Sequence, residues 1–173
     1  MRFEAMPAGD NPPDILNCVV EVPKGCSLKF EYNEEYETFI LDRVLHSPLF
    51  YPCDYGFIPQ TRSEDGDHLD VLIAVTLPSF AGAVIPARPV GLLKMVDDKG
   101  QDYKVLAVPI GDPRFKEVKN LPDLGEHIPL EISHFFQIYK DLEHKTVDVL
   151  GWGDVTEAKA EVLRSMEMYK KLG

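Results

Sequence analysis

Two groups of aspartates in this sequence each adjoin an apolar run. Asp65, Asp67 and Asp70 lie close together and lead into Val71-Leu72-Ile73. An acidic segment that contains a glycine and enters a strand is typical of a loop at the end of a sheet. Carboxylates this close repel one another unless one of them is protonated or a cation lies among them. Taken alone, the segment could equally be a solvated acidic turn.

The second group lies in a predicted hairpin. Residues 90–96 and 103–109 are apolar runs, and Gly100 marks the turn between them, so Asp97 and Asp102 flank the turn and approach each other. Like charges that face each other across a hairpin are unfavourable. Carboxylate oxygens suit hard cations such as Mg²⁺, Ca²⁺ or Mn²⁺. Two acidic loops, each next to an apolar strand, therefore predict one shared site for several metal ions.

A metal site that takes an anionic substrate also needs cationic groups. Lys104 lies two residues after Asp102, so strand alternation places both side chains on one face. Lys can hold a phosphate oxygen as a point charge, and Arg can bind one through two parallel hydrogen bonds. Taken singly, each basic candidate could be an ordinary surface charge, and each tyrosine could be structural. The candidates are Lys29, Arg43, Lys104, Lys140, Tyr51, Tyr55 and Tyr139.

Short strands followed by two helices must position these side chains. Val, Ile, Leu and aromatic residues dominate the predicted strands, which are 17–23, 28–32, 38–45, 55–59, 71–76, 84–96, 103–109 and 146–150. Apolar residues at helical spacing predict helices over residues 129–141 and 155–171. Asp154 and Glu157 are placed to form a capping box for the second helix. This order indicates an α+β fold, mainly β, with a barrel-like sheet and two C-terminal helices.

Length and charge limit the classes of partner. The 173 residues fit one domain over 1–173, and no apolar run is long enough to cross a membrane. A formal net charge of −11 argues against nucleic acid or an anionic membrane as partner. No signal peptide is visible, so a cytoplasmic location is expected by default. Cys18, Cys26 and Cys53 lack the spacing of a zinc site or a disulfide framework, and we expect them to fill the core.

The order of these motifs resembles that of the soluble family I inorganic pyrophosphatases of the prokaryotic type. The segment Asp65-Gly66-Asp67-His68-Leu69-Asp70-Val71 is similar to the signature of that family. Other similar segments follow the same order along the chain: Asp42-Arg43, Tyr51-Pro52, Asp54-Tyr55-Gly56, Arg88-Pro89-Val90-Gly91, Lys94-Met95-Val96-Asp97, Asp102-Tyr103-Lys104, His134-Phe135-Phe136 and 139–143. The resemblance implies a five-stranded OB-like barrel with flanking strands, and Mg²⁺-dependent hydrolysis of pyrophosphate to two phosphates. It also implies a homo-oligomer, a hexamer, with Mn²⁺ or Zn²⁺ as substitutes for Mg²⁺.

Position by position, the resemblance also assigns roles. Asp65, Asp70, Asp97 and Asp102 resemble metal ligands, and Asp67 resembles the group that helps to deprotonate the attacking water, with Asp102 counted beside it as catalytic. The residues that resemble phosphate ligands are Lys29, Arg43, Tyr55, Lys104, Tyr139 and Lys140. Glu21 and Glu31 resemble outer acids that orient water, and Tyr51 is expected to line the site. Asp98 receives no role.

Two histidines need separate mention. His68 stands where the family usually has Pro or Glu, which predicts a less rigid aspartate loop. For His134 we expect a position in the core or at a subunit contact rather than at a metal.

Two other functions stay open at this point. An OB-fold binding module would need a basic groove for nucleic acid, which the acidic chain does not offer. A metal-dependent nucleotide phosphohydrolase would need an apolar slot for a base, and none is identifiable in the sequence.

Overall fold

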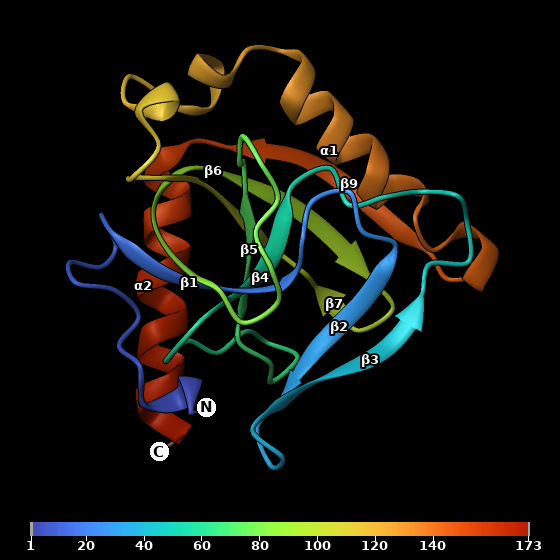
Figure 1. The fold of residues 1–173 in the computed structure, drawn as a ribbon, viewed down its shortest axis with the longest axis horizontal. Helices are drawn as coiled ribbons and strands as arrows, with labels where there is room; N and C mark the ends of the chain where they lie inside the picture. The colour runs from blue at the N-terminus through green and yellow to red at the C-terminus, as the bar shows by residue number, and fades with distance from the viewer. Residues whose placement is uncertain (1, 173) are drawn as a thin grey trace.

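Five strands close into a barrel in this computed structural model, which describes residues 2–172 (Figure 1). Around the barrel the order is β1-β4-β5-β8-β6, and β6 pairs again with β1, which closes the ring. Neighbouring strands of the ring are antiparallel except for β5 and β8, which are parallel. The strands are β1 (Leu16–Val22), β2 (Leu28–Asn33), β3 (Thr38–Val44), β4 (Asp54–Ile58), β5 (Leu69–Ile73), β6 (Val84–Asp97), β7 (Gly100–Gln101), β8 (Lys104–Pro109) and β9 (Val147–Gly153).

The remaining elements surround this barrel. Strands β2 and β3 form a separate antiparallel hairpin, whereas β7 and β9 extend the main sheet by pairing with β6. Helix α2 (Val155–Leu172) packs on β6, and α1 (His127–Ile138) packs on β9, as Figure 1 shows on two sides of the barrel. The 3₁₀ turns are η1 (Phe3–Ala5), η2 (Pro113–Phe115), η3 (Leu121–Leu124) and η4 (Asp141–Glu143).

Helix α1 buries the face that its apolar spacing predicts, and α2 begins with the predicted cap. The stripe of Ile132, Phe135, Phe136 and Tyr139 on α1 is buried. At the start of α2, the Glu157 amide donates to Asp154 Oδ1 at 2.9 Å and the Asp154 amide donates to Glu157 Oε2 at 3.1 Å. This reciprocal pair is the predicted capping box. The predicted fold class, a mainly β barrel followed by two helices, is therefore confirmed.

Several element boundaries differ from the predicted ones by up to three residues, and the starts of β5 and α1 have a clear physical reason. Strand β5 begins at Leu69, two residues earlier than its apolar run suggests, because Leu69 and Asp70 already pair with β4. Helix α1 begins at His127, which places Pro129 in the first turn. A proline is tolerated there because the first amides of a helix have no intrahelical acceptor.

The three cysteines are free, with Cys18 and Cys53 buried in the core and Cys26 half-buried, as expected for fillers. His134 is exposed, so of its two expected positions the core is wrong, and a subunit contact stays a prediction. In the described part of the chain, neither α-helix has the length and apolar character that crossing a lipid bilayer requires.

Candidate active site

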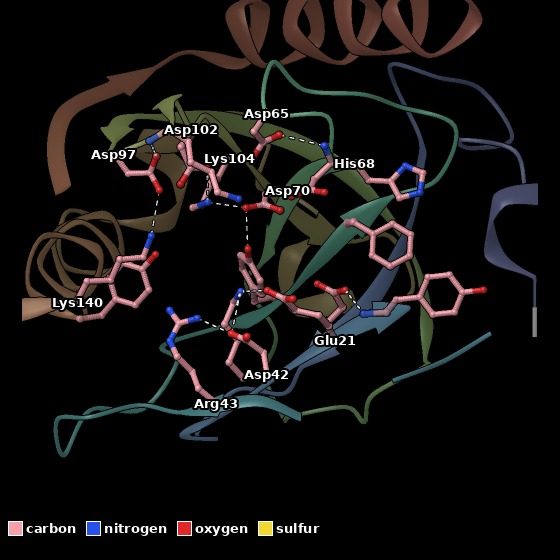
Figure 2. A pocket seen from close by; sticks show the side chains of 18 of the residues that line it. Glu21, Asp42, Arg43, Asp65, His68, Asp70, Asp97, Asp102, Lys104 and Lys140 are labelled. Carbon is pink, nitrogen blue, oxygen red and sulfur yellow. Dashed lines mark hydrogen bonds and ion pairs between the residues drawn. The ribbon is translucent and has the colours of Figure 1, made fainter. Parts of the chain in front are cut away.

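One cavity of about 460 Å³ gathers side chains from the barrel strands and from the β2–β3 hairpin. Nine acidic and seven basic side chains line it. Figure 2 shows four aspartates (Asp65, Asp70, Asp97 and Asp102) near Lys104, with Arg43 across the cavity from them. Of the residues selected from the sequence, those that line the cavity are Glu21, Lys29, Glu31, Arg43, Tyr55, Asp65, Asp67, His68, Asp70, Asp97, Asp102, Lys104, Tyr139 and Lys140.

Lys104 links the two groups of aspartates. Its side chain is 2% exposed, and its ammonium donates to Asp70 Oδ2 at 2.5 Å and to Asp102 Oδ1 at 2.6 Å. The parallel register of β5 and β8 sets Asp70 beside Lys104, and the hydroxyl of Tyr55 also donates to Asp70 Oδ2 at 2.7 Å. Burial alone would lower the pKa of Lys104, but Asp102 and Asp70 raise it well above its ordinary value. The lysine therefore stays charged among the carboxylates.

Asp97 and Lys140 form a second ion pair at the end of β6. The Lys140 ammonium donates to Asp97 Oδ2 at 3.0 Å, and the backbone amide of Lys99 donates to Asp97 Oδ1 at 2.9 Å. Burial raises the pKa of Asp97, but these two donors outweigh it and the net shift is downward. Lys140 directly follows Tyr139, the C-cap of α1, so the end of this helix places both residues at the cavity.

The loop between β4 and β5 carries Asp65 and Asp67. Gly66 has a φ of 91°, a left-handed conformation that glycine adopts without strain, and the Asp67 amide donates to Asp65 Oδ1 at 3.1 Å. Partial burial, followed by the charge of Asp65, raises the pKa of Asp67. A raised pKa makes this carboxylate a better proton acceptor than an ordinary aspartate.

The hairpin contributes basic groups to the other side of the cavity. Lys29 and Arg43 are direct partners across β2 and β3, and two cations in that position repel each other. Lys29 pairs with Glu31, while the Arg43 guanidinium donates to Asp42 at 2.5 Å and to Glu143 at 2.9 Å. Cations held side by side on a cavity wall are a favourable place for a polyanion.

Glu21 and Tyr51 take different positions at the back of the site. Glu21 accepts a hydrogen bond from the Tyr32 amide at 2.7 Å, and burial raises its pKa to about 8. Tyr51 does not line the cavity, which corrects the expectation from the sequence. Its ring is 1% exposed and packs 4.8 Å from the ring of Phe135 and 5.4 Å from that of Tyr55, measured between centroids. Tyr51 therefore supports Tyr55 from behind.

The structure adds residues that the sequence did not single out. Glu143 anchors Arg43, and Asp42 contacts both hairpin cations. Both lie in segments that resemble the family motifs, so a closer examination of these motifs could have identified them from the sequence. Other lining residues had no local signal: Tyr32, Glu34, Phe57, Arg62, Lys99 and Lys145.

The donor set fits hard cations, although no ion cage is preformed. Among residues 2–172, no three His, Cys, Asp or Glu side chains already surround a common ion position. Lys104 and Lys140 instead neutralise Asp70, Asp102 and Asp97. The cavity nevertheless supplies many carboxylate oxygens and no thiolate, the donor chemistry that Mg²⁺ prefers.

Residues 18–170 match the family model described as inorganic pyrophosphatase. The chain belongs to the inorganic pyrophosphatase family. An inorganic pyrophosphatase of Nostoc sp. is 46% identical over 98% of this chain and 100% of its own length. An inorganic pyrophosphatase of Haloferax volcanii is 47% identical over 98% of this chain and 96% of its own length. The crystal structure of inorganic pyrophosphatase from Thermus thermophilus superposes with a TM-score of 0.95 at 43% identity, covering 98% of this chain and 99% of that one.

Membership of the pyrophosphatase family makes this protein a hydrolase of a generally metal-dependent family. It also agrees with the OB-like barrel described above, since the similar structures share that fold.

Proposed function

We propose that this protein hydrolyses inorganic pyrophosphate to two phosphates in a Mg²⁺-dependent reaction without a covalent intermediate. The observation that carries the proposal is one cavity in which nine acidic side chains meet seven basic ones. Pyrophosphate is small and highly charged and has no apolar part, so its recognition must be ionic. The acids suit the metal and the basic groups suit the phosphates.

Asp65, Asp70, Asp97 and Asp102 would hold Mg²⁺, with Mn²⁺ or Zn²⁺ as substitutes. When bound, such ions lower the pKa of a water molecule from about 15.7 towards 7 and so supply a nucleophile at neutral pH. All four carboxylates line the same cavity, which supports this assignment.

The other side chains have separate tasks in this proposal. Asp67 accepts the proton of the attacking water, a task that its raised pKa favours. Glu21 and Glu31 orient water, and the groups that bind and neutralise phosphate oxygens are Lys29, Arg43, Tyr55, Lys104, Tyr139 and Lys140. Phosphoryl transfer needs positioning and charge stabilisation more than covalent help, so no nucleophilic Ser or Cys is required.

A phosphate-release assay tests the function. With Mg²⁺ present we expect turnover of pyrophosphate and little release from ATP, and with EDTA in excess we expect turnover to stop and to return when Mg²⁺ is restored. Release from ATP alone would indicate a nucleotide phosphohydrolase. No release from either substrate would favour a binding module.

We also propose a cytoplasmic homohexamer without a nucleic-acid or membrane partner. The free cysteines suit a reducing compartment, and the charge of −11 opposes polyanionic partners. Leu130 on α1, Leu142 after it and Leu150 on β9 are large apolar residues that are exposed in the single chain, as a subunit contact would need.

Light scattering checks the oligomeric state. The expected mass is about six times the 19.5 kDa of one chain. Replacement of Leu150 by Glu should shift the mass towards smaller species, whereas replacement of the exposed Leu77, far along the chain from α1 and β9, should not. A monomer at working concentration would contradict the proposal.

A further inference from the structure

His68 is the last residue of the aspartate loop, which is the segment 59–68 between β4 and β5, and it helps to join the two ends of this loop. Its side chain is 8% exposed, and its Nδ1 lies 2.9 Å from the carbonyl oxygen of Thr61. A carbonyl can only accept, so Nδ1 carries the proton of this hydrogen bond. The Thr61 hydroxyl accepts a hydrogen bond from the Leu69 amide at 2.9 Å and donates to the Ile58 carbonyl. The two ends of the loop are thereby tied to each other and to β4.

The middle of the loop, residues 63–67, is held by hydrogen bonds of its own. The Ser63 amide donates to the Asp67 carbonyl at 2.8 Å, and the Gly66 amide donates to the Ser63 carbonyl at 3.1 Å. These bonds make residues 63–67 a compact turn. The positions of Asp65 and Asp67 therefore depend on where the two ends of the loop are held.

The ring of His68 also connects this loop to the hairpin. It stacks on Phe57 of β4, with centroids 4.9 Å apart and an interplanar angle of 12°. Phe57 stacks in turn on Tyr32 of β2, at 5.8 Å and 23°. His68 Nε2 lies 3.0 Å from Glu34 Oε1, just beyond the end of β2, but it has no hydrogen-bond partner among the described residues, so the stacked rings make the connection. In Figure 2, His68 stands on the side of the cavity away from Lys140.

These contacts argue against the expectation that His68 makes the loop less rigid. We propose that His68 is a positioning residue, which holds Asp65 and Asp67 in a fixed place relative to the hairpin that carries Lys29 and Arg43. The inference rests on the proposed function, in which the loop binds the metal and the hairpin binds the phosphates. Displacement of a catalytic or binding group by about 1 Å is enough to reduce the activity of a site severely.

Three substitutions separate the two contacts of His68. His68→Asn keeps a donor near the Thr61 carbonyl and loses the stacked ring. His68→Phe keeps the ring and loses the donor, and His68→Ala loses both. His46→Ala is the matched control because His46 is exposed and does not line the cavity. For each variant we would measure Mg²⁺ binding by calorimetry without substrate, kcat and KM for pyrophosphate, and the melting temperature.

We expect His68→Ala to weaken Mg²⁺ binding about tenfold and to lower kcat/KM, because partners that support a ligand loop typically have effects of this size. The Asn and Phe variants should each recover part of the loss, and His46→Ala should match the wild type. A purely structural role would lower the melting temperature without moving Mg²⁺ affinity, and that result overturns the inference.

Three further outcomes would also overturn the inference. Wild-type Mg²⁺ affinity and kcat/KM in His68→Ala overturn the inference. If His68→Ala does not fold, the Asn and Phe variants replace it, and wild-type Mg²⁺ affinity in both of them overturns the inference. Absence of pyrophosphate turnover in the wild-type protein would overturn the proposed function itself, and this inference with it.

Discussion

Replacement of Asp67 by Asn is expected to lower kcat for pyrophosphate by about 10²- to 10⁴-fold, the range that general acid–base groups contribute. The side chain lines the cavity, and burial together with the nearby Asp65 raises its pKa. Asn keeps the shape of the side chain but cannot accept a proton. The Asp67 amide and carbonyl, which hold the loop together, are unaffected by the change. Steady-state kinetics at saturating Mg²⁺ measure the effect.

Asp98→Asn is the matched control for this prediction. Asp98 is exposed next to Asp97, has no place in the cavity lining and carries the same charge. The control should retain wild-type kcat, and both variants should show wild-type circular dichroism spectra and melting curves. Near-normal turnover in Asp67→Asn would refute the assignment of Asp67 as the proton acceptor.

Local patterns in the sequence were sufficient for much of the fold and part of the site. Strand alternation placed Asp102 and Lys104 on one face, and the structure joins them by an ion pair. The turn at Gly100 predicted that Asp97 and Asp102 approach each other, and both line the cavity. These features involve neighbours within one hairpin, whose geometry is set by turn type and by the alternation of side chains.

Such local patterns could not predict contacts between segments that are far apart in the sequence. The ion pair of Asp70 and Lys104 depends on the parallel register of β5 and β8, and closure of the barrel depends on the pairing of β1 with β6. Arg43 meets Glu143 across a hundred positions of the chain. No residue spacing encodes these contacts. The two acidic loops predicted a shared site for the segments of Asp70 and Lys104, whereas only the family resemblance brought the segments of Arg43 and Glu143 to that site.

Tyr51 and His68 show the limits of the resemblance itself. Tyr51 occupies a similar motif, yet its ring belongs to the core behind Tyr55. His68 departs from the motif, yet its ring is buried and bonded at the base of the loop. Whether a side chain faces the cavity or the core depends on packing between elements, which a motif match does not specify.

Replacement of Lys104 by Met should destabilise the metal-free protein much more than the Mg²⁺-loaded protein. Met fills a similar volume but removes the cation that Asp70 and Asp102 share. Loss of one partner from a buried pair typically costs 3–5 kcal/mol, and the partial exposure of both aspartates reduces the expected loss to about 2–3 kcal/mol. Urea unfolding in EDTA measures this change in the free energy of unfolding.

Mg²⁺ should restore most of that stability. Two carboxylates without their ammonium partner repel each other, and a divalent oxygen-seeking ion relieves the repulsion. Because a ligand that binds only the folded state stabilises it according to its concentration and affinity, Mg²⁺ should raise the melting temperature of Lys104→Met by more than it raises that of the wild type. The same variant should still lose pyrophosphate turnover, since the lysine is a proposed phosphate ligand.

Lys94→Met provides the comparison, because Lys94 pairs with Glu157 at the surface and lies outside the cavity. An exposed pair of this kind contributes little, so this variant should resemble the wild type with and without Mg²⁺. If Lys104→Met gained no more from Mg²⁺ than the wild type does, Asp70 and Asp102 would not be metal ligands. The measurement therefore tests the ligand assignment through stability alone, independently of any assay of turnover.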